Sequence, residues 1–290
     1  MKFNPPKIDL HVHTLNSDGE YPLEEVVKRA EKSGITLMAI TDHNSFTLDK
    51  ICNMDGVELI PGAEFSTTYM QDNSDEANEI HIIGLFPNGV DKDSFSFLFD
   101  RIPAEKKKYV EAILDDLSSR GVNIYMSEVE EVNPGCRKMG RHQIAQAMVK
   151  KGYAETITQA LDEQIGNYSP YYIPATRFIR YAPMEVVIKK IIAEGGIPIL
   201  AHPFGYRMNT AGIEELIRYF KEGLGNASGG VEVFYEEYVK DMGKMKFLKA
   251  MKRKYNLLAS VAGDFHGDAD SFASQGDYEL YQQMLNCISK

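Results

Sequence analysis

Six of the seven histidines lie at or near the ends of short apolar runs, and most have a carboxylate close by. The runs read KIDLHVHTLNSDG, LMAITDHNS, LIPGAEFST, EIHIIGLF, PILAHPF and SVAGDFHGD. They supply nine side chains that can bind a metal: His11, His13, Asp18, His43, Glu64, His81, His202, Asp264 and His266. Imidazole and carboxylate donors together suit zinc, manganese or iron, and nine of them suit several divalent ions. We therefore predict a multi-metal centre, which requires a fold that brings the ends of these runs together.

Strands of one sheet would bring these side chains together. In residues 7–13 apolar and polar residues alternate, so His11 and His13 point to the same side of a strand. Buried-type strands and amphipathic helices then alternate, which predicts a parallel sheet with right-handed crossovers. The expected strands are 7–13, 35–41, 57–60, 80–86, 197–201, 230–235 and 257–262, and the expected helices follow Pro22 and cover 183–195, 212–223, 238–255 and 277–289. This pattern has about one strand fewer than the standard eight-stranded barrel, whose carboxyl-terminal face carries the chemistry.

The alternation stops between about residues 91 and 180. This stretch contains charged helical sequence such as AEKKKYVEAILDDLSSRG, the run GRHQIAQAMVKKG and the tyrosine-rich segment YSPYYIP, with no convincing buried strand. We expect residues 1–90 and 181–290 to form the α/β barrel. Residues 91–180 are expected to form a helical insertion that caps its active site.

Composition excludes several classes of protein. The chain has 290 residues, of which 43% are hydrophobic and 26% charged, as expected of a protein with a sizeable core. Its net charge of −10 argues against a surface that coats nucleic acid, although metals could supply positive charge for a nucleotide substrate. Apolar runs long enough for a membrane span or a signal segment are missing, and Cys52, Cys136 and Cys287 have no disulfide spacing. We expect a cytoplasmic protein, and its oligomeric state stays open.

In their order along the chain, the metal-binding runs resemble the motifs of the polymerase and histidinol phosphatase (PHP) family. The resemblance rests on HVHT at 11–14, SDG at 17–19, TDH at 41–43, PGAEFS around Glu64, the strand with His81, AHP at 201–203 and GDFHG at 263–267. It covers both halves of the chain, and every expected ligand type is present. It implies a distorted (β/α)7 TIM-like barrel with a centre of three divalent metal ions (Mn, Fe or Zn).

The resemblance also implies how the metals share their ligands. The first would take His11, His13, Glu64 and Asp264, the second Glu64, His81 and His202, and the third Asp18, His43 and His266. Asp9 and Asp42 stand beside histidine ligands and either accept hydrogen bonds that fix imidazole tautomers or simply cap the strand ends. We expect Glu64 to be a shared catalytic ligand, and Asp42 or a metal-bound water to protonate the leaving oxygen. The predicted reaction is phosphoester hydrolysis by a metal-bridging hydroxide, without a covalent intermediate.

The helical stretch carries the indications of substrate. A long helical insertion resembles the subgroup of the family that acts on nucleotides, and its GRPHIA-like run corresponds here to GRHQIA at 140–145. Arg141 matches that run and would clamp a phosphate through two parallel donors. His142 is shifted by one position, so its role in substrate binding is open. Further candidates at the mouth, which would add positive charge or stack on a base, are Arg177, Arg207, Tyr171 and Tyr172.

The leading interpretation is a phosphatase that removes a phosphomonoester from a small nucleotide, such as a nucleoside 3′,5′-bisphosphate or an AMP-like compound. Acidic residues in VFYEE at 233–237 favour a small substrate over a long RNA, so no stable nucleic-acid complex is expected. Two other enzymes are alternatives: a 5′-to-3′ exoribonuclease on short RNA, and a histidinol-phosphate or sugar-phosphate phosphatase. A metal-binding scaffold is the non-enzymatic alternative.

Overall fold

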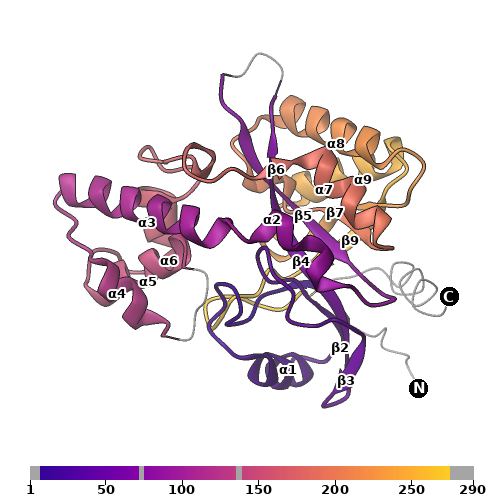
Figure 1. The fold of residues 1–290 in the computed structure, drawn as a ribbon, viewed down its shortest axis with the longest axis horizontal. Coiled ribbons are helices and arrows are strands. Elements are labelled where there is room, and N and C mark those ends of the chain that lie inside the picture. The colour runs from indigo at the N-terminus through magenta and orange to yellow at the C-terminus, as the bar shows by residue number, and fades with distance from the viewer. Residues whose placement is uncertain (1–6, 72–74, 135–138, 275–290) are drawn as a thin grey trace.

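The computed structural model describes residues 7–71, 75–134 and 139–274, which form a nearly closed, barrel-shaped sheet with helices around it (Figure 1). Seven strands follow one another in the sheet: β1 (Lys7–Val12), β2 (Ile35–Ile40), β4 (Val57–Tyr69), β5 (Asn78–Leu85), β7 (Ile197–Leu200), β8 (Gly230–Tyr235) and β9 (Leu258–Ala262). Two short strands, β3 (Cys52–Met54) and β6 (Ala182–Pro183), pair with β4. The sheet closes where His13 N donates to Phe265 O and Asp264 N donates to His11 O, both at 2.9 Å. The predicted α/β barrel is confirmed.

Strand β5 differs from the prediction of an all-parallel sheet. It pairs antiparallel with both β4 and β7, because the chain turns directly from β4 into β5 without a crossover helix. Its amino-terminal end therefore lies at the same edge as the carboxyl ends of the parallel strands. His81, near the start of β5, reaches that edge for this reason. Strand β4 is also longer than predicted, so Glu64 lies inside it and pairs with Ile83 of β5.

Four helices pack on the outside of the barrel: α1 (Leu23–Lys32), α7 (Met184–Ala193), α8 (Thr210–Leu224) and α9 (Met242–Lys254). Helix α9 begins later than predicted. The short 3-10 turn Glu236–Tyr238 precedes it, and Asp241 caps it by accepting hydrogen bonds from the backbone N–H groups of Gly243 and Lys244. The predicted helix 277–289, Cys136 and Cys287 lie outside the described residues. No helix among those described is long and apolar enough to span a membrane.

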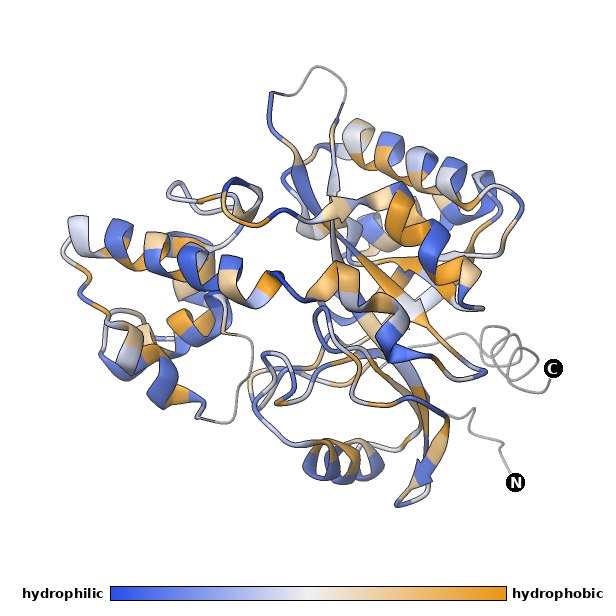
Figure 2. Ribbon diagram, viewed as in Figure 1, coloured by the Kyte–Doolittle hydropathy of each residue, from blue (hydrophilic) through white to orange (hydrophobic). Residues whose placement is uncertain are grey.

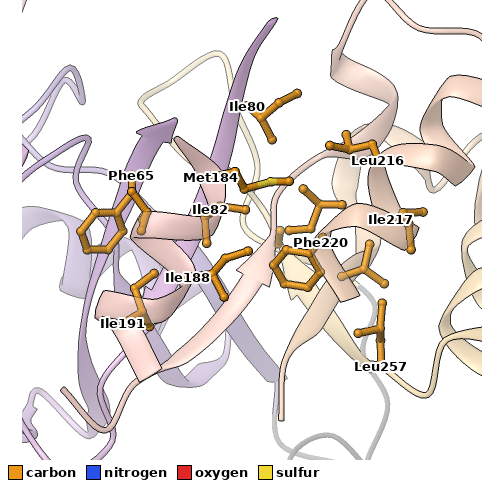
Figure 3. Close-up of a cluster of buried hydrophobic side chains, with 14 of the residues drawn as sticks. Phe65, Ile80, Ile82, Met184, Ile188, Ile191, Leu216, Ile217, Phe220 and Leu257 are labelled. Carbon is orange, nitrogen blue, oxygen red and sulfur yellow. The ribbon is translucent and has the colours of Figure 1, made fainter. Parts of the chain in front are cut away.

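Apolar side chains fill the space between the sheet and helices α7 and α8. On α8 the buried residues recur at helical spacing: Ile213, Leu216, Ile217, Phe220 and Leu224. Figure 2 shows hydrophobic residues concentrated on the central strands and on α7, whereas α8 carries both hydrophobic and hydrophilic residues. Figure 3 shows Phe220 beside Ile188 of α7, and Phe65 and Ile82 on the strands. This core fixes the strands whose ends form the site.

Residues 92–177, called the helical segment below, contain helices and turns, and their described part has no strand. The helices are α2 (Ser96–Phe99), α3 (Ile102–Ser119), α4 (Met126–Val132), α5 (Arg141–Lys150) and α6 (Ile157–Ala160), with 3-10 turns at Lys92–Phe95 and Ala175–Arg177 and a π-helical turn at Leu161–Ile165. Helices α3 to α6 lie together on one side of the barrel (Figure 1). They share a separate hydrophobic cluster that includes Ile113, Leu117, Ile144 and Met148. The helical character of this stretch is as predicted.

We expect Phe220→Ala to lower the free energy of unfolding by about 3–5 kcal/mol, because it empties a fully buried aromatic site between α8 and the sheet. Phe97→Ala is the matched control: Phe97 is 60% exposed, so its loss should change stability by less than about 0.5 kcal/mol. Denaturant unfolding followed by circular dichroism measures both. Equal effects of the two substitutions would contradict the core described here.

Candidate metal centre

The nine predicted metal-binding side chains lie at one edge of the barrel. His11, Glu64 and His81 lie within strands β1, β4 and β5. The others follow strands: His13 and Asp18 come after β1, His43 after β2, His202 after β7, and Asp264 and His266 after β9. The barrel closure places the ends of β1 and β9 side by side, although they are separated by about the whole length of the chain.

The Glu64 carboxylate lies at the middle of this cluster. It is 1% exposed, and both of its oxygens face imidazole nitrogens. The distances are 2.7 Å from Oε1 to His81 Nδ1, 3.0 Å from Oε1 to His202 Nε2, 2.9 Å from Oε2 to His43 Nδ1, and 3.3 Å from Oε2 to the Nε2 atoms of both His11 and His13. A single carboxylate thus contacts five of the six clustered histidines.

The donor atoms form three groups that overlap. One group is His11, His13 and Asp264, the second is His43, Glu64 and His81, and the third is His13, Asp18, His43 and His266. Within each group the donor atoms lie within 4.8 Å of one another. The groups resemble the ligand sets expected from the sequence, except that His43 joins the second group and His13 the third. Glu64, expected in the first set, is not in the first group, although its Oε2 lies 3.3 Å from Nε2 of His11 and of His13. His202 stands beside the second group through its contact with Glu64.

Two carboxylate oxygens in the cluster fit a cation better than a hydrogen bond. Glu64 Oε2 and Asp18 Oδ1 are buried and receive no hydrogen bond of acceptable geometry from the described residues. Buried carboxylate oxygens are normally hydrogen-bonded or coordinate a metal. The mixture of imidazoles and carboxylates is also the donor set of Zn, Mn and Fe sites. The residues present therefore fit a centre of divalent metals.

Charge in the cluster favours ionised carboxylates. Burial opposes the ionisation of Glu64, yet the imidazoles of His43, His81 and His11 hold its pKa well below the usual range. Burial similarly opposes ionisation of Asp264, whose pKa His11 and His13 lower. In the opposite direction, Glu64 raises the pKa of His81 to about 10 against the effect of burial. Divalent cations compete with protons for such imidazoles, so metal binding here would release protons.

Backbone conformation at two of the ligands is strained. His202 has φ of 26° and Asp264 has φ of 54°, in a region that residues other than glycine rarely adopt. Each residue directly or closely follows a strand, where the chain must turn to present the side chain to the cluster. Non-glycine residues in this region persist where the surrounding structure holds them, and they concentrate at functional sites.

Two carboxylates that the sequence analysis missed hold imidazoles from behind. Glu232, buried within β8, accepts a hydrogen bond from His202 N at 2.6 Å and lies 2.8 Å from His11 Nδ1. Glu79 lies 3.3 Å from His81 Nε2. Each carboxylate can take the N–H of one ring nitrogen and leave the other nitrogen free to bind a metal. Two features of the sequence could have indicated these roles. Glu232 is a carboxylate inside the apolar run GVEVF, and Glu79 lies two residues before His81, on the same face of the strand.

The described hydrogen bonds of Asp9 and Asp42 come from backbone N–H groups and hydroxyls, which favours the structural one of the two roles that the sequence left open. Asp9 accepts hydrogen bonds from the backbone N–H groups of His11, Gly263 and Ala273, and thereby ties β1 to the end of β9. Asp42 is fully buried and accepts from Thr14 N and the hydroxyls of Thr14, Ser17 and Thr47. It does not line the cavity described below. These contacts assign Asp42 to holding the loop after β1, and its role as a proton donor stays a prediction.

A cavity of about 340 Å³ lies over the cluster, between the barrel and the helical segment. Arg141 and His142, at the start of α5, line it together with Asp18, His81, His266 and Asp264. The His142 ring stacks on that of His266, with centroids 5.4 Å apart and planes 18° apart. The Arg141 guanidinium donates to Asn167 Oδ1 at 2.6 Å. Both sequence candidates from this run are thus beside the metal centre.

The other substrate candidates divide into two pairs. Arg207 and Tyr172 line a small adjoining cavity of about 50 Å³ with Arg141, and both guanidinium groups lie 5–6 Å from the Tyr172 ring. Arg177 and Tyr171 line neither cavity. Arg177 is exposed and pairs with Glu76, and the guanidinium of Arg120 lies over the Tyr171 ring. The described contacts of Arg177 therefore give no support to the expectation that it adds charge at the mouth, which stays a prediction.

We expect Glu232→Gln to weaken the binding of divalent metal about tenfold to a hundredfold, the usual effect of losing a partner that orients a ligand. The glutamine oxygen can accept a hydrogen bond from either His11 Nδ1 or His202 N, but the glutamine NH2 group then faces the other of these two donors. Glu222→Gln, which removes the same charge from an exposed position on α8, is the control. Equilibrium dialysis against Mn²⁺ measures both variants. Equal Mn²⁺ affinity in the Glu232 variant and the wild type would contradict this role.

Known proteins resemble the chain over nearly its whole length. A 5′-3′ exoribonuclease of Haemophilus influenzae is 30% identical over 269 residues, covering 90% of each chain. A 3′,5′-nucleoside bisphosphate phosphatase of Chromobacterium violaceum is 24% identical over 283 residues, covering 94% of this chain and 91% of the relative.

A solved structure of a Chromobacterium violaceum protein, described as an amidohydrolase with bound sulfate and no metal, superimposes with a TM-score of 0.77. It shares 21% identity and covers 97% of this chain and 96% of its own, so it supports the fold. The family model of the PHP domain matches residues 9–290. The chain therefore belongs to the PHP family of metal-dependent phosphoesterases.

Proposed function

We propose that this protein is a phosphatase that hydrolyses a phosphomonoester of a small nucleotide, such as a nucleoside 3′,5′-bisphosphate or an AMP-like compound. The observation that carries the proposal is the cavity over the metal cluster. Its volume of about 340 Å³ lies in the range of small-molecule sites, about 300–1,000 Å³. Metal-binding residues form one side of it, and Lys106, Arg141 and His142 of the helical segment form another.

In this proposal the nine clustered side chains, Glu64 among them, would hold three divalent ions, Mn, Fe or Zn. Bound ions of this kind supply Lewis-acid activation of water and of the phosphoryl group. Glu232 and Glu79 orient the imidazoles of His11 and His81. Glu232 also accepts a hydrogen bond from the backbone N–H of His202, where the backbone is strained, and so helps to hold this ligand in position.

Arg141 is the residue that we expect to bind a phosphate. Asn167 accepts one of its N–H groups and donates its own amide to Gly205 O, which connects Arg141 to the loop after β7. A guanidinium has five N–H donors, so others are available to a phosphate at the cavity wall. Tyr172 and Arg207 in the adjoining cavity would contact the rest of the nucleotide, with the Tyr172 ring available for stacking.

Acidic residues beside the cavity support a small substrate. Glu79 and Glu237 both line it, in a chain whose net charge is −10. Burial opposes the ionisation of Glu79, but its hydrogen bond to His81 lowers its pKa to about 2, so this carboxylate is charged at neutral pH. Negative charge at this place repels additional phosphates of a long strand. A mononucleotide presents fewer of them.

The second candidate is a 5′-to-3′ exoribonuclease acting on short RNA. It is supported by the Haemophilus influenzae exoribonuclease, which is more similar to this chain than the bisphosphate phosphatase is. The same cavity would then hold the terminal nucleotide, and the bond hydrolysed would be a phosphodiester. The two candidates differ in their products, so one experiment separates them.

The protein reconstituted with Mn²⁺ should release inorganic phosphate from a nucleoside 3′,5′-bisphosphate or from AMP with a higher kcat/KM than it shortens 5′-phosphorylated dinucleotides and short RNA. Chromatography of the products measures both reactions. Treatment with a chelator should abolish activity, and Mn²⁺ should restore it. Release of mononucleotides from RNA at the higher kcat/KM would favour the exoribonuclease, and failure to hydrolyse any of these substrates would contradict both candidates.

Replacement of Arg141 by Met should raise KM for the preferred substrate about tenfold to a hundredfold, because a charge-assisted hydrogen bond to phosphate is lost. Metal content should stay at the wild-type level, since Arg141 contacts Asn167 and not the clustered ligands. Arg177→Met is the matched control and should keep the wild-type KM, because Arg177 pairs with Glu76 away from both cavities. An unchanged KM in the Arg141 variant for every active substrate would contradict phosphate binding there.

A further inference from the structure

The loop that carries Asp18 is held on its inner side by the barrel. Asp42 accepts hydrogen bonds from Thr14 N at 2.8 Å and from the Ser17 hydroxyl at 2.6 Å. The loop also folds tightly on itself: a Cβ at Gly19 would lie only 2.9 Å from backbone atoms of His13 and Thr14. Asp18 lies in this loop, farther from a strand than the other proposed ligands, which lie in strands or within four residues of a strand end.

Two buried amides of the helical segment hold the same loop on its outer side. Gln143 Nε2 donates to the carbonyl oxygen of Asp18, and Asn133 Nδ2 donates to the carbonyl oxygen of the next residue, Gly19, both at 2.9 Å. Gln143 is fully buried and Asn133 is 8% exposed. A buried amide without a partner is costly, so these side chains and the two carbonyl groups depend on one another. Gln146 adds a hydrogen bond to Glu20 at 2.6 Å.

The Gln143 amide also fixes the start of helix α5. Its Oε1 accepts a hydrogen bond from Gly140 N at 2.9 Å, while its Nε2 is bonded to Asp18 O. Arg141 and His142 lie between Gly140 and Gln143 in the sequence, so this contact fixes the turn that carries them. One side chain therefore connects the segment that lines the substrate cavity to the loop that presents a metal-binding carboxylate.

We propose that Gln143 and Asn133 form a clamp that positions Asp18 and thereby sets the affinity of one metal position, the group of His13, Asp18, His43 and His266. This inference rests on the proposed metal centre. The other two groups receive their support from the barrel, through Glu232 behind His11 and Glu79 behind His81. Loss of the clamp should therefore weaken one metal position and leave two unchanged.

The test compares Gln143→Glu and Gln143→Leu with the wild-type protein, using Mn²⁺ alone as the probe. Equilibrium dialysis over a range of free Mn²⁺, with metal analysis by atomic emission, gives the number of ions per chain and their affinities. We expect one of three ions to bind about tenfold to a hundredfold more weakly in both variants. Gln159→Leu is the matched control and should bind Mn²⁺ like the wild type, because this half-buried amide of α6 bonds only Glu155 and Glu163 in the described contacts and not the loop around Asp18.

The Glu variant separates positioning from charge. Glutamate has the size of glutamine and keeps the acceptor for Gly140 N. Burial raises the pKa of such a carboxyl, so binding is measured at a pH high enough to ionise it, where it loses the donor to Asp18 O and adds negative charge. Added charge alone would strengthen Mn²⁺ binding. A weaker ion in Gln143→Glu therefore supports the clamp, and a stronger ion overturns it.

Amide hydrogen exchange of Gly19 and Glu20, measured without metal, gives a second readout. It should accelerate in both Gln143 variants and stay unchanged in Gln159→Leu. Wild-type Mn²⁺ binding by the Gln143 variants, or equal weakening of all three ions, would overturn the clamp and leave the proposed function intact. A wild-type protein that binds no Mn²⁺ would instead contradict the proposed metal centre itself.

Discussion

The structure depends on one buried carboxylate surrounded by imidazoles. Glu64 is 1% exposed and approaches ring nitrogens of five histidines that come from strands or strand ends on both sides of the barrel. A buried negative charge requires positive charge close by, supplied by protonated imidazoles or by metal ions. The barrel supplies the geometry for this arrangement, since strand ends remote in the sequence meet at one edge.

Carboxylates behind the cluster extend this constraint into the body of the fold. Glu232 lies behind His11 and His202, and Glu79 lies behind His81. Asp9 has a different role. It accepts hydrogen bonds from the backbone N–H groups of His11, Gly263 and Ala273, and so joins β1 to the segment after β9 where the barrel closes. Acidic residues in this protein therefore act in layers, with the inner ones facing the cluster and the outer ones holding it.

Under the proposed function, the helical segment would give the site its selectivity. The barrel edge alone presents donors for metals, whereas Arg141 and His142 reach the cavity from α5. The segment has its own hydrophobic cluster, so it can hold these residues at a distance from the barrel core. Its contacts with the loop around Asp18 mean that the wall of the cavity and one of the proposed metal-binding carboxylates are parts of the same packed unit.

The sequence by itself showed which residue types could bind metals, their order, and the helical character of the middle of the chain, and its resemblance to the PHP family implied the α/β barrel. The periodic patterns are local: an imidazole two residues from another on a strand, or apolar residues at helical spacing, can be recognised without knowing what they contact. The direction of β5 was not predictable in this way, because it follows from a direct turn that replaces an expected crossover. The roles of Glu232 and Asp42 were also decided by tertiary structure. Glu232 meets His11 across 221 residues of sequence, and Asp42 meets hydroxyl groups instead of imidazoles, since only the folded chain decides which buried donors lie within reach of a carboxylate.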